Sequence, residues 1–343
     1  MFDFIPTEYF LLAFGFILLI KGGDWFVDAA SGIAKRFKLP ELLIGATVVS
    51  IGTTLPEVMT SAMGAMSESG AIAYGNAIGS IIFNTSVIAA MTIAIRPSNT
   101  NKKTLIFPVC FFFGTAIFYS LISYINGGFD RWAGIILLIG FVAYMVVNVM
   151  NMRKNPAELD AGAIDTDSCS ESDGAEEDKP SVSSLVKDIF FLVAGALIIA
   201  VGAYLLVESA TSIAHQLGVP ESVIGLTVVA IGTSLPELVT AITSLAKGHG
   251  ALSLGNIIGA NIFNLVLVCG VSITISPFDL PVNSLLFGQN SSLVLDIPLM
   301  LTVMGVMALP PLFTGKLKRW QGISLLLLYA FFMVMQFAFV KGV

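Results

Sequence analysis

The stretch GATVVSIGTTLPEVMTSAMG, residues 45–64, returns later in the chain as GLTVVAIGTSLPELVTAITS, residues 225–244. Each copy places one glutamate directly after a proline in an apolar run, at Glu57 and at Glu237. A carboxylate at membrane depth is costly unless a cation meets it, and such residues mark ion pathways in membrane proteins. Two copies of this costly arrangement therefore predict a cation site to which both glutamates contribute.

The composition places the chain in a lipid bilayer. Apolar residues make up 56% of its 343 residues and charged residues 12%, and the mean hydropathy of +0.89 is too high for a soluble globular protein. A helix needs about 20 apolar residues to cross the hydrocarbon core, and the apolar runs do not alternate as the strands of a membrane barrel would. We predict an all-α polytopic membrane protein with ten transmembrane helices, near residues 8–32, 40–66, 71–95, 103–124, 131–152, 184–212, 220–246, 251–274, 292–313 and 319–340.

The two motifs belong to a longer internal repeat. Residues 45–88 align without a gap with residues 225–268, and 20 of the 44 positions are identical. RWAGI at Arg131 also matches RWQGI at Arg319. Because each half has an odd number of spans, the second half must enter the membrane in the opposite direction, as in transporters with inverted-topology repeats. The predicted units are a first five-helix repeat over 1–152 (α-repeat at about 40–95), a linker over 153–182, and an inverted second repeat over 183–343 (α-repeat at about 220–274).

The distribution of charge predicts the orientation. Residues 157–180 contain nine acidic residues and few apolar ones, which predicts a disordered linker. If the N-terminus is outside, 14 of the 17 lysines and arginines fall on the linker side, as the positive-inside rule requires of the cytoplasmic face. We therefore expect the linker in the cytoplasm and both termini outside, in a prokaryotic plasma membrane. Within the first span, the spacing of Lys21 and Asp24 predicts a local ion pair.

The prolines beside the glutamates are expected to disturb their helices. A proline inside a helix removes the hydrogen bond to the carbonyl four residues earlier, here at Gly52 and Gly232. Such a break is tolerated at membrane depth only where it is buried in protein or lines a watery cavity. The freed carbonyls can then serve as ligands.

Oxygen-bearing side chains surround each glutamate in the sequence. Hydroxyls three or four residues before a glutamate share its helix face, and a second element in each half, GNAIGSIIFN and GNIIGANIFN, adds further oxygens. Calcium takes about six to eight hard oxygen ligands, and two carboxylates balance its charge. The candidates found in this way are Thr53, Thr54, Ser80 and Asn84 in the first half, and Thr233, Ser234 and Asn264 in the second.

These motifs resemble the two α-repeats of the calcium/cation antiporter superfamily, in particular its sodium/calcium exchanger branch, and the ten-helix pattern extends the resemblance to essentially the whole chain. The resemblance implies that Glu57 and Glu237, with the carbonyls of Thr53 and Thr233, hold calcium at a central site. It implies alternating access, in which the first and sixth helices slide over a fixed core. The sodium positions that it implies are Ser50, Thr54, Ser80, Ala230 and Ser234.

Two positions depart from the sodium/calcium exchanger pattern. Asn264 stands where an aspartate is common, and Ala260 where a serine is frequent. Two carboxylates still suffice for calcium, whereas the sodium stoichiometry stays open. Gly79 and Gly259 stand where the proton-coupled branch typically has a glutamate, which argues against calcium/proton exchange. Coupling to a proton or another monovalent cation, and transport of another divalent cation, are the alternatives.

Other protein classes are less compatible with the sequence. A passive cation channel could also use a pair of carboxylates, and an intramembrane enzyme could use them as an acid/base pair. The chain offers no nucleophile constellation or cofactor motif, and its three cysteines and two histidines are scattered, so neither a disulfide framework nor a zinc cluster is expected. We predict a secondary antiporter for Ca²⁺ and Na⁺, with one chain as the transport unit and without a cofactor or a nucleic-acid partner.

Overall fold

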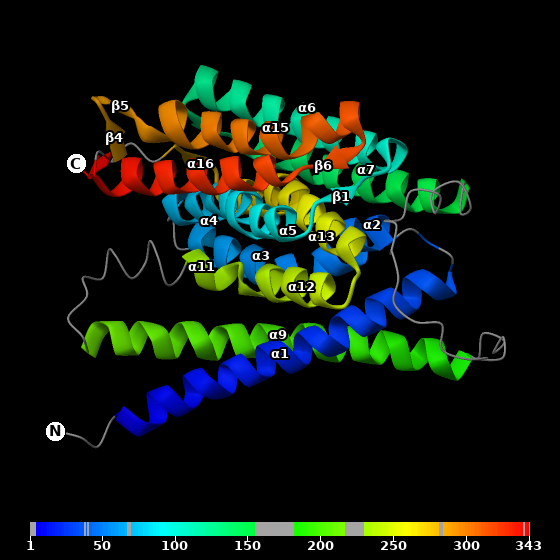
Figure 1. The fold of residues 1–343 in the computed structure, drawn as a ribbon. Coiled ribbons are helices and arrows are strands. Elements are labelled where there is room, and N and C mark those ends of the chain that lie inside the picture. Colours follow the sequence, from blue (N-terminus) through cyan, green and yellow to red (C-terminus); the bar gives the residue numbers. More distant parts are fainter. Residues whose placement is uncertain are drawn as a thin grey trace.

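The computed structural model describes residues 5–37, 39, 41–66, 70–154, 182–216, 230–280, 284–338 and 340–342. Its helices form layers (Figure 1). The long helices α1 (Ile5–Arg36) and α9 (Val182–Gln216) cross each other in an outer layer. The α-repeat helices fill the middle, and the remaining long helices cover the other side.

The first half places its α-repeat between α1 and two long helices. The α-repeat consists of α2 (Glu41–Ile44), the π-helical segment η1 (Gly45–Val49), α3 (Ser50–Met66), α4 (Gly70–Phe83), the π-helical segment η2 (Asn84–Ala89) and α5 (Ala90–Ile95). The elements that follow are β1 (Ser98–Asn99), α6 (Lys102–Asn126), β2 (Gly128–Phe129) and α7 (Arg131–Lys154).

The second half repeats this order after α9. Its α-repeat consists of α11 (Ala230–Thr233), α12 (Leu235–Ala246), α13 (Gly250–Phe263), the π-helical segment η4 (Asn264–Val268) and α14 (Cys269–Ile275). The elements that follow are β3 (Phe278–Asp279), β4 (Ser284–Leu286), β5 (Gln289–Asn290), the π-helical segment η5 (Ser292–Asp296), α15 (Ile297–Thr314), β6 (Lys316–Leu317), α16 (Arg319–Ala338) and β7 (Val340–Gly342).

Eight helical stretches of the described residues are long and apolar enough to cross a membrane, and they match eight predicted spans to within a few residues. The shorter helix α12 and the 20-residue helix α16 occupy the places of the seventh and tenth spans. The prediction of an all-helical, polytopic membrane protein is therefore confirmed. The start of the seventh span and nearly all of the predicted linker 153–182 lie outside the described residues.

Short strand pairs join the two halves in a way that shows their inverted relation. β1 and β3 each follow an α-repeat, whereas β2 and β6 each follow the next long helix. β1 pairs antiparallel with β6, and β2 pairs antiparallel with β3. Each pair thus joins the strand after one α-repeat to the strand after the next long helix of the other half, so the two pairs are equivalent to each other. The 25-residue helix α6 separates β1 from β2, so equivalent pairs lie at opposite ends of the helical bundle.

The long helices α6 and α15, which precede β2 and β6, end in the same way. Gly127 ends α6 and Gly315 ends α15, both with a φ of 70°. Only glycine adopts this left-handed conformation without a Cβ penalty. The amide of Gly127 bonds to the carbonyl of Ser123, and that of Gly315 to the carbonyl of Pro311. Both ends lie just before the matching RWAGI and RWQGI motifs.

The α1–α9 layer is held together by close backbone approach. A Cβ at Gly15 would lie 2.9 Å from the carbonyl oxygen of Gly202, and one at Gly195 would lie 3.0 Å from that of Gly22. The internal repeat relates the two contacts to each other, because Gly15 in the first half is equivalent to Gly195 in the second, and Gly22 is equivalent to Gly202. Small residues allow membrane helices to approach this closely. α1 contacts α9 far more extensively than either helix contacts the core, so the two form one unit.

Substituting valine at Gly195 should separate this unit. The new side chain would meet the backbone nitrogen of Phe26 at 2.8 Å, and the backbone cannot yield without moving α1. We expect Gly195→Val to cost about 1–3 kcal/mol and to lower the thermal unfolding midpoint in detergent. Gly114→Val on α6 is the matched control, since nothing lies within 4 Å of that position. Equal midpoints for the two variants would contradict the close packing.

Candidate ion-binding site

Glu57 on α3 and Glu237 on α12 meet in the interior of the protein. Both are fully buried, with 0% exposure, and they are close enough for their charges to repel. Each carboxylate faces hydroxyls from the opposite half. Ser234 lies beside Glu57, and Thr53 and Thr54 lie beside Glu237, where the Thr54 hydroxyl donates to Glu237 Oε1 at 3.4 Å. The site is therefore built jointly by the two repeats.

The two carboxylates have little internal compensation. Both oxygens of Glu57, and Oε2 of Glu237, are buried without a hydrogen-bond partner among the described residues. No ion pair found in the described part of the chain involves either glutamate. Burying a charge without a partner is strongly unfavourable. The arrangement therefore suits an external cation.

Two asparagines that our sequence reasoning did not single out orient the hydroxyls of this site. Asn256 accepts a hydrogen bond from Thr53 at 3.2 Å and donates to Thr240 at 2.9 Å. Its repeat equivalent, Asn76, accepts from Thr233 at 3.2 Å and donates to the carbonyl of Glu57 at 3.2 Å. Each asparagine follows the first glycine of a GNxIG motif, and this repeated position was the signal in the sequence.

Two predicted serines also join this network. Ser50 is fully buried and donates to the carbonyl oxygens of Gly45 at 2.7 Å and of Asn256 at 2.9 Å. Ser80 is 3% exposed and accepts from Ser234 at 3.3 Å. Hydroxyls placed around the two carboxylates are hard oxygen donors of the kind that Na⁺ and Ca²⁺ bind.

The remaining predicted residues differ in how the structure places them. Asn84 and Asn264 are fully buried, and the side-chain amide of each has no hydrogen-bond partner among the described residues. Each is the first residue of a π-helical segment, η2 or η4, a feature that is frequent at functional sites. No hydrogen bond joins either asparagine to a glutamate in the described structure. Ala230 begins α11, and its side chain lies outside the described residues.

The predicted helix breaks are confirmed in one half only. In the second half, Ser234 leaves the helical conformation, with φ −91° and ψ 8°, and α12 begins with Pro236 in its first turn. In the first half, α3 continues through Pro56 from Ser50 to Met66, so the predicted break there is wrong. The π-helical segment η1 directly before α3 is the irregularity in this half, and it ends before the proline.

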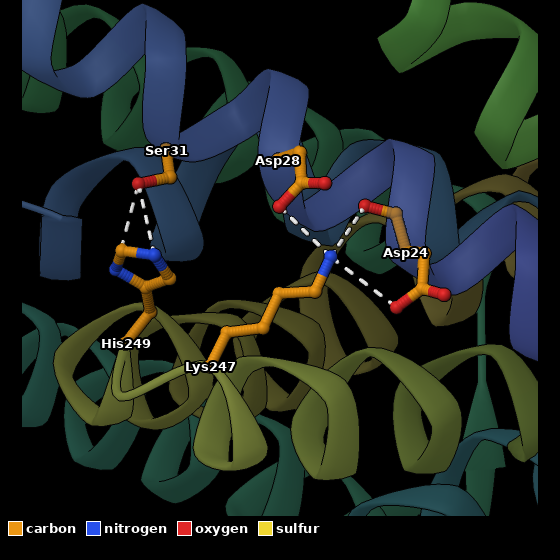
Figure 2. Close-up of polar contacts among 5 residues, drawn as sticks. All are labelled: Asp24, Asp28, Ser31, Lys247 and His249. Carbon is orange, nitrogen blue, oxygen red and sulfur yellow. Dashed lines mark hydrogen bonds and ion pairs between the residues drawn. The ribbon is translucent and has the colours of Figure 1, made fainter.

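A polar cluster connects α1 to the loop between α12 and α13. Figure 2 shows the ammonium of Lys247 between two carboxylates of α1, 2.8 Å from Asp28 and 3.2 Å from Asp24. His249 lies 2.7 Å from Glu41 on α2 and 3.3 Å from the Ser31 hydroxyl on α1. The predicted pair between Lys21 and Asp24 is therefore wrong, because Asp24 is paired across the layers instead.

Lys247 follows the end of α12 and lies outside the spanning segments, whereas its partners Asp24 and Asp28 belong to α1. Its partial burial disfavours the ammonium form, but hydrogen bonds and charge interactions with Asp28 and Asp24 outweigh this effect and raise the pKa of Lys247 above its ordinary value. A lysine with a raised pKa stays protonated throughout the physiological pH range. The cluster therefore persists wherever these carboxylates are ionised.

Comparison with known proteins agrees with this fold. The family model described as "Sodium/calcium exchanger protein" matches residues 7–150 and 187–338. Sodium/calcium exchanger MaX1 of Methanosarcina acetivorans is 30% identical over 97% of this chain and 99% of its own. Inner membrane protein YrbG of Escherichia coli is 35% identical over 83% of this chain and 84% of its own.

Solved structures show the same architecture. The sodium-calcium exchanger NCX_Mj, soaked with Na⁺ and Sr²⁺, is 30% identical to this chain, with a TM-score of 0.78 over 95% of this chain and 97% of its own. A structure of the same exchanger soaked with Na⁺ and Ca²⁺ gives the same TM-score. The chain belongs to the sodium/calcium exchanger family, within the calcium/cation antiporters, which are membrane transporters and not enzymes.

Asn256 offers a test of the hydroxyl network. We expect Asn256→Ala to weaken Ca²⁺ binding about 10- to 100-fold, the usual effect of losing a group that orients metal ligands, because the Thr53 and Thr240 hydroxyls lose their partner. ⁴⁵Ca²⁺ binding to the purified protein would measure this. Asn148→Ala is the matched control, since this fully buried asparagine donates to the carbonyl of Tyr144 on its own helix. Unchanged binding in Asn256→Ala would exclude an orienting role.

Proposed function

We propose that this protein exchanges Ca²⁺ for Na⁺ across the membrane by alternating access to the site of Glu57 and Glu237. The observation that carries the proposal is the pair of fully buried carboxylates, one from each inverted repeat, that face each other without a protein cation among the described residues. Two negative charges match one divalent cation, so Ca²⁺ removes the electrostatic cost of burying both.

The hydroxyls around the carboxylates support sodium as the coupling ion. Neutral hydroxyl oxygens come from both halves, at Thr54, Ser234, Ser50 and Ser80. These oxygens suit Na⁺ ions that replace Ca²⁺ beside the same two carboxylates. Gly79 and Gly259 supply no acid for proton coupling. The relatives named as sodium/calcium exchangers agree with this choice. Asn264 brings no third carboxylate, so sodium binding depends on the two glutamates.

The layered structure supports the mechanism. α1 and α9 cross as one unit beside a core to which both halves contribute (Figure 1). Within that core, Gly45 and Gly259 permit backbone contact between η1 and α13, and a Cβ at Gly45 would lie 2.7 Å from the amide nitrogen of Asn256. A rigid core and a separate two-helix layer are the parts that a sliding mechanism needs. We propose that the α1–α9 layer slides over this core.

The Lys247 cluster is placed to hold this layer on one side of the membrane. Lys247 and His249 belong to the core loop that connects α12 and α13, whereas Asp24, Asp28 and Ser31 belong to α1 (Figure 2). Movement of α1 away from the loop would break these contacts. We propose that they favour the conformation that is closed at this membrane face.

The proposed organisation places the ion site between two five-helix repeats, 1–152 and 183–343, joined by the linker 153–182. The charge distribution supports a linker in the cytoplasm and both termini outside. The multi-pass fold and the archaeal and bacterial relatives support a prokaryotic plasma membrane. A single chain holds both carboxylates, which supports one chain as the transport unit.

Neutralising either glutamate should abolish exchange. Glu57→Gln or Glu237→Gln keeps the shape of the side chain but removes one of the charges that hold Ca²⁺. Two unit charges 4 Å apart in a protein environment interact with about 4 kcal/mol, and the doubly charged Ca²⁺ with about twice that, so the affinity should fall more than about a thousandfold. The measurement is ⁴⁵Ca²⁺ uptake into proteoliposomes driven by an outward Na⁺ gradient. Glu208→Gln, which changes an exposed residue of α9, should leave uptake intact.

The same assay separates the proposed function from its alternatives. Uptake driven by a proton or K⁺ gradient but not by Na⁺ would overturn sodium coupling. Calcium flux that needs no counter-ion would indicate a channel. Uptake at the wild-type rate in either glutamine variant would remove the central site itself.

Breaking the Lys247 cluster should change access at its own membrane face. Lys247→Met keeps the apolar stem but removes both ion pairs, which are worth up to about 1 kcal/mol each at partly exposed positions. We expect the apparent Ca²⁺ affinity measured from that face to rise about fivefold, because the conformation open on that side becomes more populated. Oriented vesicles assayed separately at each face would show this.

Two further variants control this experiment. Lys247→Arg keeps the charge and should behave as the wild type. Lys316→Met removes an exposed charge from β6, away from α1, and should change neither face. An equal change in affinity at both faces in Lys247→Met would show that the cluster affects the site directly and does not control access.

A further inference from the structure

A cavity of about 140 Å³ lies next to the central site and is lined by residues of α4, α11, η5 and α16. Asn76 and Ser80, which contact the central site, line one part of it. Tyr74 of α4, Asp296 of η5 and Gln336 of α16 line another. The function proposed above makes no use of these last three residues.

Each of the three residues carries a buried polar atom with no hydrogen-bond partner among the described residues. These atoms are the Tyr74 hydroxyl, Asp296 Oδ1 and Gln336 Oε1. The side chain of Tyr74 is almost completely enclosed, at 3% exposure. Native proteins leave few buried polar atoms unpaired, and those that remain point to a bound water or ion. Three such atoms around one cavity indicate a common ligand.

Helix capping does not explain the position of Asp296. An acidic residue just before a helix usually caps it, but Asp296 has helical backbone angles, φ −66° and ψ −53°, and its side chain makes no cap hydrogen bond to α15. It lies inside the apolar stretch Ser292–Thr314, which is long enough to span a membrane. None of the ion pairs in the described parts of the chain includes it. An unpaired carboxylate at this depth indicates a functional site.

We propose that Asp296, Tyr74 and Gln336 bind one Na⁺ ion at a site separate from the central carboxylates. All three side chains offer oxygen, the donor that hard cations prefer, and the Ser292 hydroxyl lies beside the same carboxylate. One carboxylate neutralises one monovalent charge, whereas a divalent ion would leave an excess charge in apolar surroundings. A water molecule takes about 30 Å³ in the liquid, so the cavity has room for the ion and some waters.

The site has no counterpart in the other half of the protein. The alignment that pairs Arg131 with Arg319 places Pro108 at the position equivalent to Asp296. The cavity reaches Asn76, which accepts a hydrogen bond from Thr233 and donates to the carbonyl of Glu57. A sodium ion at Asp296 would therefore reach the central site from one side only, through Asn76. It could add to the sodium bound by the protein without displacing Ca²⁺ directly.

The test uses a protein whose central site has been disabled. In Glu57→Gln/Glu237→Gln, we expect purified protein to bind about one ²²Na⁺ per chain in a saturable manner, because one unpaired carboxylate remains to balance it. Adding Asp296→Asn should remove this binding. Adding Tyr74→Phe, which deletes only the hydroxyl, should weaken the affinity roughly tenfold, the typical effect of losing a hydrogen bond to a charged partner. Asp279→Asn, which changes an exposed acid of β3, should leave binding unchanged.

Two results would overturn the proposal. One is equal ²²Na⁺ binding with and without Asp296→Asn, and the other is no ²²Na⁺ binding at all to the double glutamine variant. Tyr74→Phe keeps the test valid if Asp296→Asn does not fold, because unchanged affinity in that milder variant would also contradict the site. Failure of the exchange function is a separate result, since it would appear as absent Na⁺-driven Ca²⁺ uptake in a protein that still binds ²²Na⁺ through Asp296.

Discussion

The structure depends on two like charges, Glu57 and Glu237, held together away from water without a compensating protein cation among the described residues. Such a pair opposes folding, because burial disfavours each carboxylate and the two repel each other. A cation between them converts this cost into an attraction. The surrounding core must therefore hold the carboxylates at a fixed separation, and the two repeats share this task.

The way in which the halves interlock provides that rigidity. Asn256 of the second half accepts from Thr53 of the first, and Asn76 of the first accepts from Thr233 of the second. One threonine hydroxyl of each half, Thr53 or Thr233, is thus oriented by an amide from the other repeat. A core constructed in this way cannot open between its halves without breaking the site. In the proposed mechanism, motion is therefore left to the α1–α9 layer, which forms most of its contacts within itself.

The sequence was sufficient to predict features that repeat, and insufficient for features that depend on pairing across the fold. The spans and the two glutamates were predictable because identity between the halves and apolar length both mark them. The roles of Asn76 and Asn256 were not, because Thr53 and Asn256 are 203 positions apart. Asp24 lies close in sequence to Lys21, but the layering brings Lys247 to it. Asp296 lies inside the predicted span 292–313, but only the structure shows the cavity and the unpaired oxygens near it.

The departures from symmetry carry the most functional meaning. If the two halves were identical, the central site would have the same relation to both faces of the membrane. Where Lys247 and His249 stand in the second half, the first half has Ser67 and Ser69, which offer no positive charge to hold a carboxylate. The positively charged side chain of Lys247 ties α1 to the core on one face, and the equivalent sequence of the first half therefore lacks such a side chain. Identical repeats cannot favour opening towards one membrane face. Any preference of the exchanger for one resting conformation must therefore come from residues that differ between the halves, such as these.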